Sequence, residues 1–183
     1  MLGRSARARA ARLLDDITEA FRPFGYHEAG RPGPLEARLE RRGGLPIVLR
    51  FIQRGRVVGG QVVLEVATAD PVLPRSERGL TARPRGALKL RGIAFRARGA
   101  DVGARQLAER LSEDRRLGDA LSKVHFERIR VEPDGRAVIT HVGGSVVWTL
   151  FPPLVRPVPL VPEQAKATAD ALKAFAAAGS ARG

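Results

Sequence analysis

The sequence consists of segments with a helical pattern of apolar residues and segments with a strand pattern. The order of these segments along the chain predicts the fold class. Apolar residues three or four positions apart predict helices over residues 5–21, 101–124 and 163–178. Residues 35–68, 87–99 and 125–151 instead carry short segments of alternating polarity, which predict strands. Runs of strands separated by runs of helices are typical of α+β proteins. We therefore expect residues 1–183 to form one α+β domain. It would hold a single bent antiparallel sheet of about six or seven strands, with helices packed on one face.

Three segments rich in proline have no helical or strand pattern. Residues 22–34 and 69–86 each contain three prolines together with glycine and arginine, so we expect loops there. The second of these is basic and is a candidate contact loop. Residues 152–162 contain five prolines and should run extended along a sheet edge or across the surface.

Within the helical and strand segments, particular residues predict where a helix begins and where a hairpin turns. The Ser112–Asp114 segment reads as the start of a new helix, which divides residues 101–124 into two helices. Pro133-Asp134-Gly135 predicts a hairpin turn in which Glu132 pairs with Arg136 and Gly135 adopts the left-handed conformation.

A short pattern, V-G-G-[QS]-V-V, occurs at residues 58–63 and again at residues 142–147. No Lys-Ser/Thr and helix follow either copy, so neither is a phosphate-binding P-loop. We expect a structural device in both places. A bulge would bend the strand at Gly59-Gly60, and a turn or bulge would do so at Gly143-Gly144.

The composition narrows the cellular setting. The chain has no cysteine, which excludes disulfides, cysteine-ligated metals and thiol nucleophiles. No apolar run is long enough to span a bilayer, and the basic N-terminal segment lacks the apolar core of a signal peptide. We expect a cytoplasmic protein without a membrane partner.

The charge of +13 is concentrated in one half of the chain. Residues 1–100 hold 20 basic and nine acidic residues, whereas residues 101–183 hold 12 basic and ten acidic residues. Such a front half would attract a polyanion, including nucleic acid, without sequence specificity. The alternative is that the excess of arginine reflects composition bias on a solvated surface. The candidate anion-binding residues are Arg50, Arg54, Arg56, Arg91, Arg96 and Arg98.

Two histidines and a carboxylate form the second candidate group. With the predicted turn, the hairpin register would put Glu127 opposite His141 and leave His125 on the same face. The three could form an acid–base or metal-binding cluster, or a plain cross-strand pair near the sheet end. Because no recognised catalytic motif is present, we predict no catalytic residue, metal or cofactor.

The second half of the chain resembles a known family. The segments "ARQLAERLSEDRRLGDAL", "FERIRV" and "GGSVVWTLFPPLVRPVPLVPEQ" are similar to the middle and C-terminal parts of a bacterial domain-of-unknown-function family. The resemblance covers about residues 100–178. The family has no assigned activity, so the resemblance implies no catalytic residues.

Two functions follow as hypotheses. The first is a non-enzymatic cytoplasmic binding module whose basic half contacts an anionic partner, either nucleic acid or a phosphate-bearing ligand. The second is a cavity-forming domain that binds a small apolar molecule between sheet and helices, with His125, Glu127 and His141 near the cavity mouth.

Overall fold

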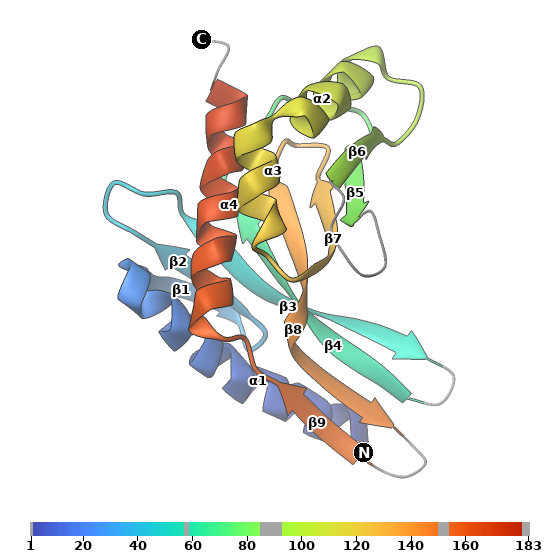
Figure 1. The fold of residues 1–183 in the computed structure, drawn as a ribbon. Helices are drawn as coiled ribbons and strands as arrows, with labels where there is room; N and C mark the ends of the chain where they lie inside the picture. The colour runs from blue at the N-terminus through green and yellow to red at the C-terminus, as the bar shows by residue number, and fades with distance from the viewer. Residues whose placement is uncertain (1, 57–58, 85–92, 150–153, 181–183) are drawn as a thin grey trace.

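The computed structural model describes residues 2–56, 59–84, 93–149 and 154–180 (Figure 1). Its helices are α1 (Leu2–Phe21), α2 (Val102–Glu113), α3 (Arg115–Ser122) and α4 (Pro162–Ser180), with a short 3₁₀ helix at Arg22–Phe24. Its strands are β1 (His27–Gly33), β2 (Glu36–Glu40), β3 (Ile47–Arg56), β4 (Gly59–Thr68), β5 (Leu80–Pro84), β6 (Ile93–Ala97), β7 (Phe126–Val131), β8 (Ala137–Thr149) and β9 (Leu154–Val158). The predicted α+β class is confirmed.

All nine strands form one antiparallel sheet. The strand order is β1-β2-β3-β4-β8-β7-β5-β6, and β9 pairs with the second half of β8. The 13-residue β8 therefore has β4 along one side and two different partners, β7 and then β9, along the other. This change of partner makes β8 the organising strand of the sheet (Figure 1).

The helices pack on one face of this sheet, and alternation along the strands supplies the contact. Ile47, Leu49 and Phe51 alternate along β3 and are buried. In the helix layer, Phe175 of α4 packs edge-to-face on Phe95 of β6, with ring centroids 5.8 Å apart. α1 crosses the opposite end of the sheet and contacts β8, β9 and α4 (Figure 1). None of the helices in the described residues combines the length and the apolarity that a membrane span needs.

The predicted division of residues 101–124 into two helices is confirmed. The Asp101 carboxylate caps α2 by accepting hydrogen bonds from the backbone N–H groups of Gly103 and Ala104. Asp114 ends α2 and caps α3 by accepting from the Leu117 N–H at 3.0 Å. Each aspartate satisfies N–H groups that a helix start leaves without an intrahelical partner.

The strand count of six or seven was too low, because two strands lie in segments predicted to be loops. β1 is an edge strand with irregular register opposite β2, and an edge tolerates Pro32 and the glycines beside it. β5 has only five residues, of which Leu80 and Ala82 face the core. Neither segment shows the long alternation from which strands are predicted. The predicted extended course after residue 152 is confirmed for β9; Pro152 and Pro153 lie outside the described residues.

The two copies of V-G-G-[QS]-V-V prove to be neighbours. β4 and β8 run antiparallel, so that Val62 lies opposite Val146 and Gly60 lies opposite Trp148. The expected bulge at Gly59-Gly60 is wrong, because both glycines pair regularly with β3 and β8. A side chain at position 60 would overlap the Trp148 ring, so this glycine admits the tryptophan rather than bending the strand.

A turn or a bulge was expected at Gly143-Gly144, and the structure has a bulge there. Val63 lies opposite Ser145 and Glu65 lies opposite Thr140, so the four residues from His141 to Gly144 face Leu64 alone. Gly144 has φ +63°, in the left-handed region. A Cβ atom there would lie 2.8 Å from Leu64 Cδ2 and 3.3 Å from Ile17 Cδ1. The bulge thus lets α1 approach the sheet closely.

We expect Gly144→Ala to lower the free energy of unfolding by about 1–3 kcal/mol, because the new methyl group combines backbone strain with a clash. Urea denaturation measures the change. The matched control is Gly118→Ala in α3, where a Cβ meets no atom within 4 Å, and where alanine should stabilise the helix by roughly 0.5–1 kcal/mol. Equal stability of Gly144→Ala and the unmodified chain would contradict the assigned bulge conformation.

Candidate anion-binding site

The sheet face opposite the helices carries arginines and carboxylates in register. Arg50 on β3 lies opposite Glu65 on β4, which lies opposite Thr140 on β8. Thr140 in turn lies opposite Arg128 on β7. We call this the open face. Its polar side chains point away from the helices because their neighbours along each strand face the apolar core.

Glu65 is the centre of the open face, although it is fully buried. Its carboxylate accepts hydrogen bonds from Arg50 Nε at 3.0 Å, from Arg130 Nη2 at 2.8 and 2.9 Å, and from Thr140 Oγ1 at 3.2 Å. The arginine side chains thereby cover the carboxylate that no helix covers. Removing one member of such a buried group costs of the order of 3–5 kcal/mol, because the remaining charges lose their partners.

A second carboxylate, Glu132 at the end of β7, extends this network. It pairs with Arg50 Nη2 at 3.0 Å and with Arg136 Nη2 at 2.7 Å. Burial lowers the pKa of the Arg50 guanidinium, but hydrogen bonds and charges from Glu132 and Glu65 outweigh burial and raise it overall. Arg136 also holds Asp134 at 2.7 Å. Burial raises the pKa of the Asp134 carboxyl, but the hydrogen bonds that it accepts from Arg136 outweigh burial, so the pKa is lowered overall.

Both predicted features of the hairpin turn are confirmed: Glu132 pairs with Arg136, and Gly135 has φ +94°.

Farther along the open face, Arg54 reaches across β4 and β8 to Glu127. Its Nη1 lies 2.6 and 2.7 Å from the two carboxylate oxygens. Arg128, next to Glu127, has no acidic side chain within 4 Å among the described residues. Burial lowers the pKa of its guanidinium, and the positive charges of Arg130 and Arg54 lower it further.

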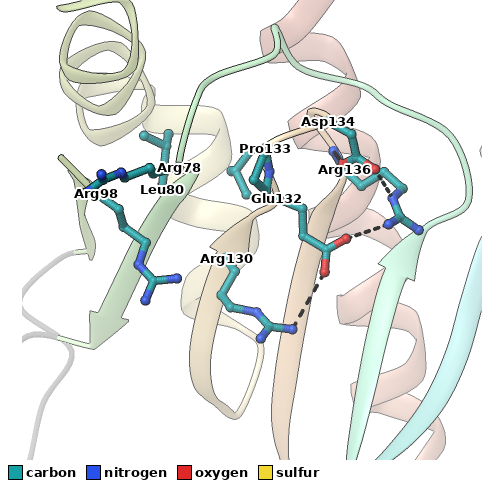
Figure 2. Close-up of a pocket in the computed structure, with 9 residues that line it drawn as sticks. Arg78, Leu80, Arg98, Arg130, Glu132, Pro133, Asp134 and Arg136 are labelled. Atoms are coloured by element: carbon teal, nitrogen blue, oxygen red, sulfur yellow. Dashed lines mark hydrogen bonds and ion pairs between the residues drawn. The ribbon is translucent and has the colours of Figure 1, made fainter. Parts of the chain in front are cut away.

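A pocket of about 350 Å³ opens at the end of the sheet beyond this network. It is lined by Arg78, Leu80, Arg98, Arg130, Val131, Glu132, Pro133, Asp134 and Arg136. Arg78 and Arg98 come from the β5–β6 side, and the acidic residues come from the β7–β8 hairpin (Figure 2). Within the described ranges, neither Arg78 nor Arg98 has a carboxylate within 4 Å, whereas Arg130 and Arg136 are both paired. The pocket therefore carries two guanidinium groups whose charge no carboxylate in the described part of the chain neutralises.

Hydrogen bonds fix the backbone on both sides of Arg78. The Ser76 N–H donates to the Pro133 carbonyl at 2.9 Å, and the Gly79 N–H donates to Ser76 Oγ at 3.0 Å. The Arg98 N–H donates to the Gly79 carbonyl at 3.1 Å, which joins the two arginine-bearing segments. Gly79 has φ +70°, and a side chain there would overlap the Val131 carbonyl. These contacts hold Arg78 and Arg98 at the same pocket.

A family model described as a protein of unknown function (DUF3156) matches residues 19–178 of the chain. The chain belongs to the DUF3156 family. The resemblance expected from the C-terminal half is thus confirmed, and the match extends well beyond residue 100 toward the N-terminus. Searches of curated proteins and of solved structures found no significant match.

The DUF3156 chain places its predicted arginines in different environments. Arg50 and Arg54 lie on the open face, but carboxylates neutralise both. Arg96 is exposed on β6, and it points toward the open face because its neighbour Phe95 packs on α4. Of the predicted arginines whose side chains the structure describes, Arg98 is the one that lines the pocket. Arg91 and the side chain of Arg56 lie outside the described part of the chain.

The other three arginines of this pocket, Arg78, Arg130 and Arg136, were not among the predicted anion-binding residues. Arg130 falls in the alternating segment FERIRV, where it faces away from the buried Ile129 and Val131. Arg136 follows the predicted turn directly. Arg78 lies in the segment that was predicted to be a basic contact loop. Alternation could have placed Arg130 on the open face, but the pairing of β5 with β7, which joins the two sides of the pocket, has no local signal.

The expected cluster of His125, Glu127 and His141 is wrong in register. Phe126, not Glu127, lies opposite His141, because β7 has a one-residue bulge at Glu127. Glu127 lies on the open face with Arg54, while His141 is buried on the helix face. No group of three His, Asp or Glu side chains in the described residues is placed to hold a metal ion.

His141 instead joins β8 to α4. Its Nε2 lies 3.1 Å from Thr168 Oγ1, and that hydroxyl donates to the Gln164 carbonyl at 2.6 Å. The threonine proton is therefore committed, and His141 Nε2–H donates to Thr168. Gln164 also accepts from the His125 backbone N–H at 2.7 Å. Burial, with a smaller effect from His125, lowers the pKa of His141 to about 4.

We expect this histidine to make folding stability pH-dependent. The pKa of His141 is lower in the folded chain than in the unfolded chain. Its contribution to the free energy of unfolding is therefore fully present above pH 6.5 and is lost as the pH falls toward 4. The His141 contribution should fall by about 2 kcal/mol between about pH 8 and pH 5. Urea denaturation at the two pH values measures it. His141→Gln should remove this component, while the control His125→Gln should keep it. An unchanged pH dependence in His141→Gln would contradict the assignment.

Proposed function

We propose that this protein is a non-enzymatic binding module for a small phosphate-bearing ligand, held in the pocket of Arg78, Arg98, Arg130 and Arg136. One observation carries the proposal. Two guanidinium groups that have no carboxylate partner among the described residues face the same concavity as two that are paired. Arginine binds phosphate oxygens through paired N–H donors, and such charge-assisted hydrogen bonds are among the strongest that side chains make.

The charge distribution favours a small ligand over a nucleic acid. A polyanion needs unpaired basic side chains that follow its backbone over many ångströms. Here Arg50 and Arg54, which extend across the open face, are neutralised by Glu65, Glu132 and Glu127. Arg78 and Arg98, which have no carboxylate partner in the described residues, instead line one pocket of about 350 Å³, which suits a small molecule.

The hydrogen bonds that the acidic residues of the pocket accept support binding without catalysis. Both Glu132 oxygens accept from arginines, and Asp134 is held by the Arg136 side chain and backbone. A general base needs a carboxylate that is free to take a proton from the substrate. These two carboxylates instead orient Arg136. We propose the cytoplasm as the place of this binding, since a chain without cysteine needs no oxidising compartment.

The apolar-ligand hypothesis stays a prediction. Large side chains, including those of Phe21, Tyr26 and Phe175, are fully buried between the sheet and the helices. Their packing adds no support for a cavity at that place, so the arginine pocket is the better-supported site.

We expect calorimetric titration with inorganic phosphate and with adenosine monophosphate to show one shared site. Loss of one charge-assisted contact in Arg98→Gln or Arg78→Gln should weaken binding about tenfold. Arg54→Gln serves as the matched control, because Arg54 is on the open face but outside this pocket. The control should keep the affinity of the unmodified chain.

A single-stranded oligonucleotide forms the third arm of this experiment. Competition between the oligonucleotide and phosphate, with both lost in Arg98→Gln, would place nucleic acid at the same pocket. Oligonucleotide binding that is tight, strongly salt-dependent and unchanged in both pocket variants would contradict the small-ligand proposal. So would phosphate binding that neither variant weakens.

A further inference from the structure

Two β-bulges lie beside each other in adjacent strands, at the level where Arg54 crosses the open face. In β8 the bulge covers His141 to Gly144, opposite Leu64 of β4. In β7 the bulge lies at Glu127, between the pairs Phe126–His141 and Arg128–Thr140. Bulges interrupt the ladder and redirect side chains, and they occur often beside functional sites. Here they separate His141 and Glu127 onto opposite faces of the sheet.

A second pocket, of about 360 Å³, lies at these bulges. Arg54 and Gln61 line it from β3 and β4, and Glu127, His141, Val142 and Ser145 line it from the two bulged strands. None of these residues belongs to the phosphate pocket. The second pocket therefore stands on observations of its own.

The polar atoms at this pocket are only partly satisfied. Arg54 uses Nη1 for both oxygens of Glu127, while its Nη2 is buried and has no hydrogen-bond partner in the described residues. His141 also lines the pocket, but it is 1% exposed and its imidazole lies on the helix face against Thr168, so Arg54 and Glu127 are the charged groups that a ligand would meet. Buried polar atoms without partners are rare in folded proteins, because each costs its full desolvation.

The charges at the pocket balance. Arg54 is positive, Glu127 is negative with its side chain 48% exposed, and His141 is neutral at neutral pH because burial lowers its pKa to about 4. A dianion such as phosphate would meet Glu127 as well as Arg54, so it gains little here. A molecule with one positive and one negative group can instead lie head-to-tail beside the ion pair. Both of its charges then meet an opposite charge.

We propose that the second pocket binds a small zwitterion of the α-amino-acid type, with its carboxylate on Arg54 and its ammonium group on Glu127. Gln61 and Ser145 supply neutral donors and acceptors at the same pocket. The V-G-G-S-V-V segment then has a role beyond architecture, because its bulge forms one wall of the site.

NMR titration of the backbone amides of the full chain tests this proposal. The probes are glycine, L-alanine and L-leucine, with acetate and methylammonium as single-charge controls. We expect saturable shifts at Val142 and Ser145 with at least one amino acid, and binding about tenfold weaker for acetate and for methylammonium. Arg98→Gln, in the phosphate pocket, should leave these shifts unchanged.

The Glu127→Gln variant separates a binding role from a structural one. It removes the partner of the ammonium group and releases Arg54, so the preferred ligand should change. We expect amino-acid binding to weaken about tenfold and acetate binding to strengthen. Circular dichroism confirms that the variant is folded. No saturable shift with any of the three amino acids would overturn the proposal, as would acetate binding equal to that of the amino acids in the unmodified chain.

Discussion

The burial of the Glu65 carboxylate on a sheet face without helices is the constraint on which the open face depends. Its partners, Arg50, Arg130 and Thr140, come from strands on both sides of β4. Arginine stems cover the apolar parts of the sheet while their guanidinium groups satisfy the carboxylate. The ion network thus takes the place of a second layer. Because it fixes Arg130 and, through Glu132, Arg136, it also sets one wall of the pocket that Arg78 and Arg98 line.

The same network divides the arginines by role. Arg50, Arg54, Arg130 and Arg136 are paired with carboxylates and stabilise the sheet, whereas Arg78 and Arg98 are not paired within the described residues. In this DUF3156 member, part of the arginine excess is therefore paired with carboxylates on the open face. A small part of it is positioned, by the backbone contacts of Ser76 and Gly79, at one concave place.

Local patterns were enough to predict the fold class, the division of residues 101–124 into two helices, and the Pro133-Asp134-Gly135 turn. The edge strand β1 and the short β5 were missed, because irregular register and five-residue length leave little alternation. Of the pocket, only Arg98 was predicted. Long-range pairings bring its other members together, and a one-residue bulge moved Glu127 away from His141. Composition could not predict which arginines are neutralised, because the carboxylates that pair with them are distant in the sequence.

The most direct test is an NMR titration that follows the arginine Nε–Hε signals as inorganic phosphate is added. It measures each guanidinium group separately, whereas a binding isotherm measures only their sum. The division of roles predicts saturable shifts at Arg78 and Arg98, with Arg50 and Arg54 unchanged. Equal shifts at all four arginines, or shifts confined to Arg50 and Arg54, would contradict it.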